Sequence, residues 1–298
     1  LCPMTLDDFI TTVFCVSDDF LTSYLDGRRL RQRGPRPTVP DSVVVTCELV
    51  GEFLGYDTDS GIYRYIRRHH LDLFPSMGEV HRTTFVRQAA NLWTIKERLQ
   101  ALLQRLICCD RQLSIVDSFP VPVCRFARAK RCRRLLGTAA FGYDDLARQT
   151  FYGLRGHVRI AWPGVIIRAE LAPANTSDVQ MAPCLLDGAD GWALADRNYW
   201  SPQLFERLRE RGLPLLTPFK TKTHETTPWP ITLTQKRRRI ETVIGQLTER
   251  FQAKKVWARD RWHVYTRWIR KVASHTMAVL LCREQGLPPL RFAELITD

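Results

Sequence analysis

The chain has 298 residues, 45% of them hydrophobic and 25% charged, which excludes a disordered or fibrous protein and is long enough for two globular domains. Lys and Arg total 44 against 31 for Asp and Glu, and the resulting formal charge of +13 favours a polyanionic partner such as nucleic acid, although a basic but unrelated enzyme stays open. The nine cysteines form no Cys-x-x-Cys pair, so we expect reduced thiols rather than a zinc site or a disulfide framework. The sequence also shows neither an apolar run of membrane-spanning length nor a signal-peptide pattern, and we expect a cytoplasmic protein without a membrane partner.

Residues 1–107 are predicted to form a helical domain. Apolar residues at helical spacing predict helices over 7–25, 42–54, 59–70 and 82–107, with Asp41 as an N-cap and a Pro-rich break over 34–40. We interpret this basic domain as a DNA-binding and assembly domain. A helical subdomain that only packs against the rest of the chain is the alternative, because no helix-turn-helix signature is clear.

The pattern changes near residue 111, where 113–117 reads as a short buried strand ending in Asp117. Pro120 and Pro122 follow and are predicted to stop strand pairing. A dense group of cations comes next, in a loop or short helix able to lie along a phosphate backbone. A solvated charged face is the alternative. The group comprises Arg125, Arg128, Lys130, Arg131, Arg133 and Arg134.

The next segment predicts an antiparallel hairpin, with strands over 150–160 and 165–172 and a turn at Gly164. His157 lies in the first strand, where it either faces a site or is a hydrogen-bonded structural histidine. The elements expected after the hairpin are a capped turn over 173–178, a strand over 191–196 ending in Asp196, a helix over 202–211 capped by Ser201, a strand over 213–217 and an exposed loop over 219–234.

A helix near 236–247 carries one acid, Glu241, directly after four cations. An apolar stripe on this helix predicts a buried face, and Glu241 lies at its edge. A surface glutamate on a solvated helix is the alternative to a functional acid. The stripe comprises Ile240, Val243, Ile244, Leu247 and Phe251, and a last amphipathic helix is predicted over 262–284.

Three acids stand out in this order of elements: Asp117 and Asp196 each end a strand, and Glu241 is on a later helix. The order predicts an α/β protein whose residues 108–298 form a ribonuclease H-like mixed sheet with flanking helices. Carboxylates at adjacent strand ends can share two Mg²⁺ ions, or Mn²⁺ in their place. Two such ions activate a nucleophile and stabilise a leaving oxygen in phosphodiester displacement. The nearby acids Asp144, Asp145, Asp178 and Asp187 are predicted to tolerate substitution.

Four segments, 115–120, 151–157, 195–199 and 237–241, resemble those of DDE transposases, and more narrowly those of the insertion sequence 982 family. The resemblance implies a ribonuclease H-like core and metal-dependent cleavage and strand transfer at the terminal inverted repeats of a bacterial insertion sequence. It assigns Asp117, Asp196 and Glu241 as the catalytic and metal-binding acids. It also implies a nucleoid-associated location in a bacterial cell.

The expected partner is double-stranded DNA, both element ends and target, bound by a homodimer. Predicted DNA contacts are the six cations of 125–134 together with Arg155, Arg237 and Arg238. Two alternatives stay open on the sequence: a non-catalytic DNA-binding or regulatory protein of the same fold, and a nuclease of this fold without strand transfer.

Overall fold

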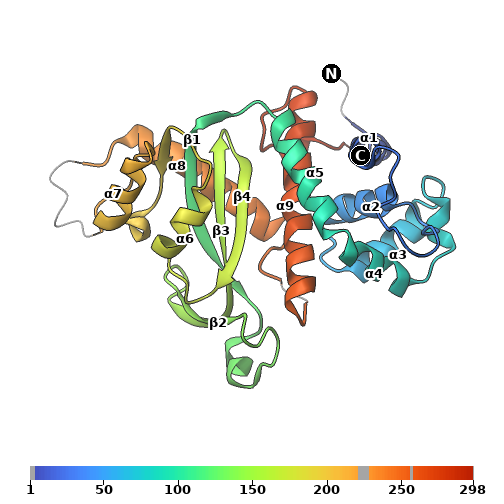
Figure 1. Cartoon of the computed structure of the whole chain (residues 1–298), viewed down its shortest axis with the longest axis horizontal. Coiled ribbons are helices and arrows are strands. Elements are labelled where there is room, and N and C mark those ends of the chain that lie inside the picture. The colour runs from blue at the N-terminus through green and yellow to red at the C-terminus, as the bar shows by residue number, and fades with distance from the viewer. Residues whose placement is uncertain (1–3, 221–227, 256–257, 298) are drawn as a thin grey trace. The chain divides into compact units, whose positions relative to one another are not determined.

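The computed structural model describes residues 4–220, 228–255 and 258–297, and the chain divides into two compact units (Figure 1). The helical unit comprises Leu1–Leu106, Glu249–Gln252 and Trp262–Asp298, and the sheet unit comprises Ile107–Thr248 and Ala253–Arg261. The predicted division placed residues 262–298 with the second domain, whereas their contacts group them with the N-terminal helices. Within the described ranges, no helix combines the length and the apolar character that crossing a membrane requires.

The helical unit is built from α1 (Leu6–Leu25), α2 (Asp41–Phe53), α3 (Asp59–His69), α4 (Arg82–Asn91), α5 (Trp93–Leu106) and α9 (Arg261–Glu284). The first three predicted helices and the last are confirmed. The single helix predicted over 82–107 is wrong: α4 ends at Asn91, and the fully buried Leu92 occupies a turn before α5. Asp41 is the first residue of α2 rather than its cap, which is Pro40.

Helix α2 is the centre of the helical unit, because every residue from Ser42 to Phe53 is buried. Close packing on α3 requires Gly51, where a Cβ atom would lie 2.6 Å from the Ile62 side chain. A side chain there would force α2 and α3 apart, so the glycine sets the spacing of the two helices.

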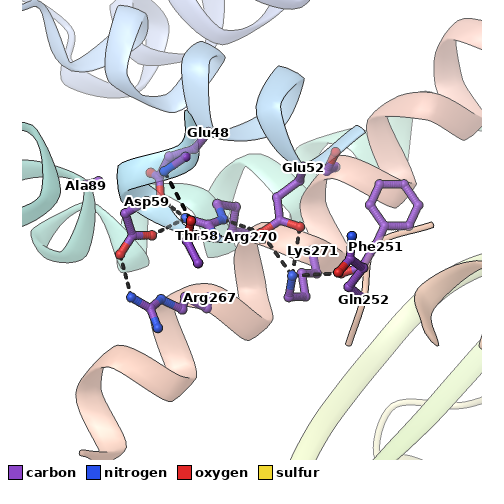
Figure 2. Close-up of polar contacts among 12 residues, drawn as sticks. Glu48, Glu52, Thr58, Asp59, Ala89, Phe251, Gln252, Arg267, Arg270 and Lys271 are labelled. Atoms are coloured by element: carbon purple, nitrogen blue, oxygen red, sulfur yellow. Dashed lines mark hydrogen bonds and ion pairs between the residues drawn. The ribbon is translucent and has the colours of Figure 1, made fainter. Parts of the chain in front are cut away.

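The buried side of α2 also carries charge, and α9 carries the charge that balances it (Figure 2). Arg270 Nε donates to Glu52 Oε1 at 2.7 Å, and Arg270 Nη1 donates to Glu48 Oε1 at 3.2 Å. Lys271 Nζ donates to Glu52 Oε2 at 2.8 Å. These four side chains are at most about 5% exposed, so the pairs lie in the interior of the unit.

Two further helices contribute to the same ion network. Asp59, from α3, accepts from both Arg270 and Arg267 of α9, the latter at 2.7 Å. Lys96, from α5, donates to both carboxylate oxygens of Glu48 at 2.8 Å. Because an unpaired buried charge is very unfavourable, these pairs hold α9 within the helical unit although the sheet unit separates them in sequence.

The sheet unit contains β1 (Asp110–Pro122), β2 (Ala140–Asp144), β3 (Gln149–Trp162), β4 (Val165–Pro173), β5 (Trp192–Leu194) and β6 (Leu215–Leu216). Its order is β2-β3-β1-β5-β6, and β4 pairs with β3 beside β2. Strand β1 runs antiparallel to β3 and parallel to β5, so the sheet is mixed as predicted. The predicted hairpin is confirmed as β3 and β4, with Gly164 at a φ of 135° in the turn. Strand β2 was not predicted.

Strand β1 is longer than predicted and continues through Pro120 and Pro122. Pro120 pairs with Arg155 and Pro122 with Gly153 of β3. On the other side of β1, pairing with β5 covers only Leu113–Ile115. The prolines are two residues apart, so their nitrogens point to the same edge of β1. A proline is tolerated in a strand where the edge that its nitrogen faces has no pairing partner. The prediction that they stop pairing is therefore wrong.

The flanking helices of the sheet unit are α6 (Asp178–Leu185), α7 (Pro202–Glu210) and α8 (Ile231–Glu249), with short 3-10 helices η2 (Phe126–Arg131) and η3 (Arg197–Tyr199). The Ser201 cap of α7 is confirmed by its bond from Leu204 N at 3.4 Å. The predicted buried stripe of α8 is confirmed at Ile240, Val243 and Leu247. Helix α8 begins inside the loop expected over 219–234, and residues 221–227 of that loop lie outside the described residues.

Candidate functional site

The strand register of the sheet unit sets Asp117 and Asp196 side by side. Ile115 of β1 pairs in parallel with Leu194 of β5. Each acid lies two residues further along its own strand direction, and residues two apart share a face of a sheet. Asp196 has left β5 and is the N-cap of η3, where its Oδ1 accepts from Asn198 N at 3.0 Å. The predicted convergence of these two strand-end acids thus follows from the topology.

The two carboxylates lie in an environment that disfavours their charge. Burial, and after it the charge of Asp196, raises the pKa of Asp117 to about 7. Burial and the charge of Asp178 raise the pKa of Asp196 to about 6. A backbone donor, Ser118 N, binds Asp117 Oδ1 at 2.8 Å and offsets only part of this effect. The pair therefore favours a positively charged partner at neutral pH.

Asp178 is a further acid of this site that the sequence analysis missed. It is the first residue of α6, 7% exposed, and its charge raises the pKa of both Asp117 and Asp196. Burial raises the pKa of Asp178 itself. From the sequence, Asp178 is expected to tolerate substitution. Packing of α6 against β3 and β1 makes it an interior residue. No local sequence signal marks it, because it is the last residue of the capped turn predicted over 173–178.

Side chains from β1 and β3 surround Asp178. His157 is fully buried, with Nδ1 at 3.4 Å from Asp178 Oδ1, and burial followed by Arg155 lowers the pKa of the imidazole to about 3. His157 is thus a neutral group next to the acids, as the interpretation that it faces a site expects. Within the described residues neither ring nitrogen has a hydrogen-bond partner, so the alternative of a hydrogen-bonded structural histidine is not borne out. Arg155 Nη1 donates to Ser118 Oγ at 3.3 Å and Nη2 donates to the Tyr143 carbonyl at 2.8 Å.

Tyr199 is a second residue that the sequence did not single out. Its side chain is fully buried, and within the described ranges its hydroxyl has no hydrogen-bond partner. Burial and the charges of Asp178, Asp117 and Asp196 raise its pKa well above the usual value. The phenol therefore stays protonated and lies within electrostatic range of all three acids.

Glu241 is connected to the site by Arg237, which contacts both Glu241 and Asp117. Arg237 Nη2 donates to Glu241 Oε1 at 2.8 Å, while Arg237 Nη1 lies 3.9 Å from Asp117 Oδ2. Both residues are on α8, one turn apart, and the Glu241 side chain is 51% exposed. The guanidinium thus bridges Glu241 and Asp117, so the third predicted acid lies at the edge of the site in an ion pair.

The site offers some of the oxygen ligands that a hard divalent cation prefers. Carboxylate oxygens are the ligands that Mg²⁺ prefers, and Asp117 and Asp196 carry charge that the surrounding residues do not balance. In the part of the chain that the structure describes, no group of three or more Asp, Glu, His or Cys side chains is gathered as a metal site. Glu241 Oε1 instead accepts from Arg237.

The predicted DNA-contacting cations lie in three places. The five arginines of 125–134 line one cavity, whereas Lys130 lies outside that lining. Arg155 and Arg237 contact residues of the acid site, and Arg238 is exposed on α8. Two neighbours of Arg238 were not predicted as contacts: Lys236 and Arg239 lie over the Trp162 ring, at 4.7 and 5.2 Å from its centroid.

Comparison with known proteins gives one match. A family model described as a transposase DDE domain covers residues 108–260, just over half of the chain and all of the segment that carries Asp117, Asp178, Asp196 and Glu241. No curated protein matches the chain, and no solved structure matches it. The chain belongs to the family of transposases with a DDE domain.

Proposed function

We propose that this chain cuts DNA at the terminal inverted repeats of an insertion sequence and joins the cut strand to target DNA. We further propose a ribonuclease H-like core and a place in the insertion sequence 982 group, on the four sequence segments described above. The observation that carries the proposal is the parallel register of β1 and β5, which sets Asp117 beside Asp196. Their raised pKa values indicate a pair that a cation stabilises.

Asp117 and Asp196 would hold divalent metal, with Glu241 as the third acid. Two Mg²⁺ ions, or Mn²⁺, would activate the attacking oxygen and stabilise the leaving oxygen of the phosphodiester. The chain's own residues position these acids: Ser118 N and Asn198 N each fix one carboxylate oxygen. Arg237 keeps Glu241 beside Asp117 and reduces repulsion between them.

The remaining roles concern DNA and assembly. We assign phosphate contacts to the five arginines of 125–134 and to Arg155, Arg237 and Arg238, since Arg forms bidentate contacts with phosphate. A homodimer would bring two element ends together, and the helical unit would contribute to end recognition and to that assembly. Replacing exposed Arg238 by Glu should then weaken duplex binding without regard to sequence.

The test is incubation of the full chain with a duplex that carries the terminal repeat and its flanking DNA, with Mg²⁺ and a target plasmid. Joined product, absent with Asp117→Asn and retained with exposed Asp145→Asn, supports the proposal. Nicked product alone makes the chain a nuclease without strand transfer. Binding with neither product would make it a DNA-binding or regulatory protein of the same fold.

A further inference from the structure

A cationic cavity of about 860 Å³ opens where β1 ends. Five arginines of 125–134 line it, and Lys254 and Lys255 join them from the segment that follows α8. These lysines are more than a hundred residues from the arginines in the sequence, so no local pattern connects them. We call this the cationic pocket.

The fold builds the cationic pocket from two chain segments that are fastened together. Val123 N donates to the Tyr152 carbonyl at 3.0 Å, which anchors the exit from β1 to β3. Leu135 N donates to the Arg259 carbonyl at 3.3 Å, which joins the end of the arginine segment to the segment after α8. Ala129 of η2 and Ala253 are both buried, so each segment has an apolar anchor beneath its cations.

The chemistry of the lining selects a phosphate backbone rather than bases or a small apolar ligand. None of the described lining residues is acidic, so the cations within the pocket repel one another. An anion with several charges relieves this repulsion, and the guanidinium fork matches phosphate oxygens. None of the described lining residues is aromatic, so the pocket offers no platform on which a base could stack.

The distance between the cationic pocket and the acid site follows from β1 itself. Pro122 lines the pocket and Asp117 lies five residues earlier on the same strand. At about 3.3 Å per strand residue, the separation along β1 is about 17 Å. Because duplex DNA rises about 3.4 Å per base pair, that length corresponds to about five base pairs of a duplex that lies along β1.

We propose that the cationic pocket holds backbone phosphates of the duplex about five base pairs from the phosphodiester that is cut. This inference rests on the proposed function for the identity of its ligand. It assigns Lys254 and Lys255 to the DNA interface and removes Lys130 from it.

The first experiment measures duplex binding by the full chain across a range of salt concentrations. Arg128→Glu with Arg131→Glu, and separately Lys254→Glu with Lys255→Glu, should each weaken binding at least tenfold at low salt. Each pair should reduce the log–log salt slope by about 2, because each lost phosphate contact contributes about 0.9. Lys130→Glu, on the same short helix but outside the lining, is the matched control and should bind as the parent does. Equal weakening by the control, or parental binding by either pair, would overturn the inference.

The second experiment needs no variant and therefore does not depend on whether the charge reversals fold. Single methylphosphonate linkages, which lack the negative charge, are placed at successive positions of the duplex. Binding by the parent should weaken most for linkages about five base pairs from the cut, on either strand. Equal binding for every linkage position, or weakened binding only for a linkage at the cut itself, contradicts the inference. Binding that weakens at one localised set of linkages, without any cleavage, would remove the proposed function and leave the phosphate assignment of the pocket standing.

Discussion

Asp59 of the helical unit and the partly buried Asp117 of the sheet unit have pKa values that shift in opposite directions. In the helical unit, Arg270 and Arg267 contact Asp59 directly and outweigh its burial, so its pKa lies well below the usual range (Figure 2). In the sheet unit, burial and neighbouring acids raise the pKa of Asp117 to about 7. Cationic partners therefore outweigh burial at Asp59, whereas at Asp117 they do not.

This difference distinguishes charged residues that stabilise the fold from charged residues that serve a function. A buried network with every charge paired holds helices in one arrangement, and it is complete without any ligand. A buried pair of like charges opposes folding, and it persists where another component of the complex supplies the balancing charge. The contrast between Asp59 and Asp117 therefore favours a functional role for the second acid and not for the first.

The largest effect should come from breaking the buried ion network of the helical unit. Arg270→Met leaves Glu48, Glu52 and Asp59 short of a partner in the interior, and removal of one partner of a buried ion network costs about 3–5 kcal/mol of unfolding free energy. Urea unfolding of the full chain, with hydrogen exchange in α2 and α9 as the local readout, measures it. Arg291→Ala, which breaks an exposed pair with Glu294, is the control and should cost less than about 1 kcal/mol. Similar losses from both variants would mean that the buried network contributes no more than a surface pair.

In the sheet unit, by contrast, a substitution is expected to raise the free energy of unfolding. Asp117→Asn removes one charge from the repelling pair and keeps the volume of the side chain. At about 1.4 kcal/mol per pKa unit, the rise of the Asp117 pKa from 3.8 to about 7 corresponds to about 4 kcal/mol near pH 8, where both acids are charged. Because the side chain is 19% exposed, solvent screening reduces the expected gain in stability of the metal-free chain to about 1–2 kcal/mol. Thermal unfolding with chelator present tests this, with Asp145→Asn as the neutral control. A destabilised Asp117→Asn chain would show that the carboxylate is already compensated.

A smaller effect is expected at Asp178, where the structure leads to a different prediction from the tolerance expected from sequence. Asp178 adds negative charge to the pair from the start of α6. Asp178→Asn should lower cleavage about tenfold, which is about 1.4 kcal/mol, and should also reduce the rise in melting temperature that Mg²⁺ produces. A merely structural role would lower the melting temperature without changing its response to Mg²⁺. Asp187→Asn, at an exposed position, serves as the control.

The smallest effect should come from Arg237, the cation nearest the acids. Its pair with Glu241 is a half-exposed contact between residues one turn apart on α8, and its approach to Asp117 is 3.9 Å. Arg237→Gln should therefore cost about 0.5 kcal/mol or less in the metal-free chain. A loss comparable to that of Arg270→Met would show that Arg237 neutralises the site as fully as the helical network is neutralised.

Local pattern predicted much of the fold. The helices α1, α2, α3 and α9, the β3–β4 hairpin and the stripe of α8 follow from periodicity and turn residues, which are properties of neighbouring positions. The break at Leu92 and the five-residue strand β2 were missed because tertiary contacts decide them: Leu92 is buried at the helix junction, and Phe141 of β2 has its pairing partner, Tyr152, on β3.

The residues of the candidate site also fall into two groups, those predicted from local sequence and those whose role depends on tertiary packing. Asp117 and Asp196 were predicted because each follows an apolar strand, and parallel pairing then brings them together. Asp178 and Tyr199 were missed because nothing local distinguishes an acid at a helix start, or a tyrosine in a short turn, from surface residues. Their importance arises from packing of α6 and η3 beside β1. Likewise, Lys254 and Lys255 join the arginines of 125–134 only through the folded chain.

The central claim is that Asp117 and Asp196 form an uncompensated pair that takes up divalent metal, and metal-dependent thermal unfolding tests it most directly. Mg²⁺ or Mn²⁺ at about a hundredfold excess over its dissociation constant should stabilise the parent by about 2.7 kcal/mol. That corresponds to a rise of about 5–10 °C in the melting temperature of a chain of this size. The double variant Asp117→Asn with Asp196→Asn should respond little, and Asp145→Asn should respond like the parent. A parent whose melting temperature does not change, or a double variant that gains as much as the parent, would contradict the account.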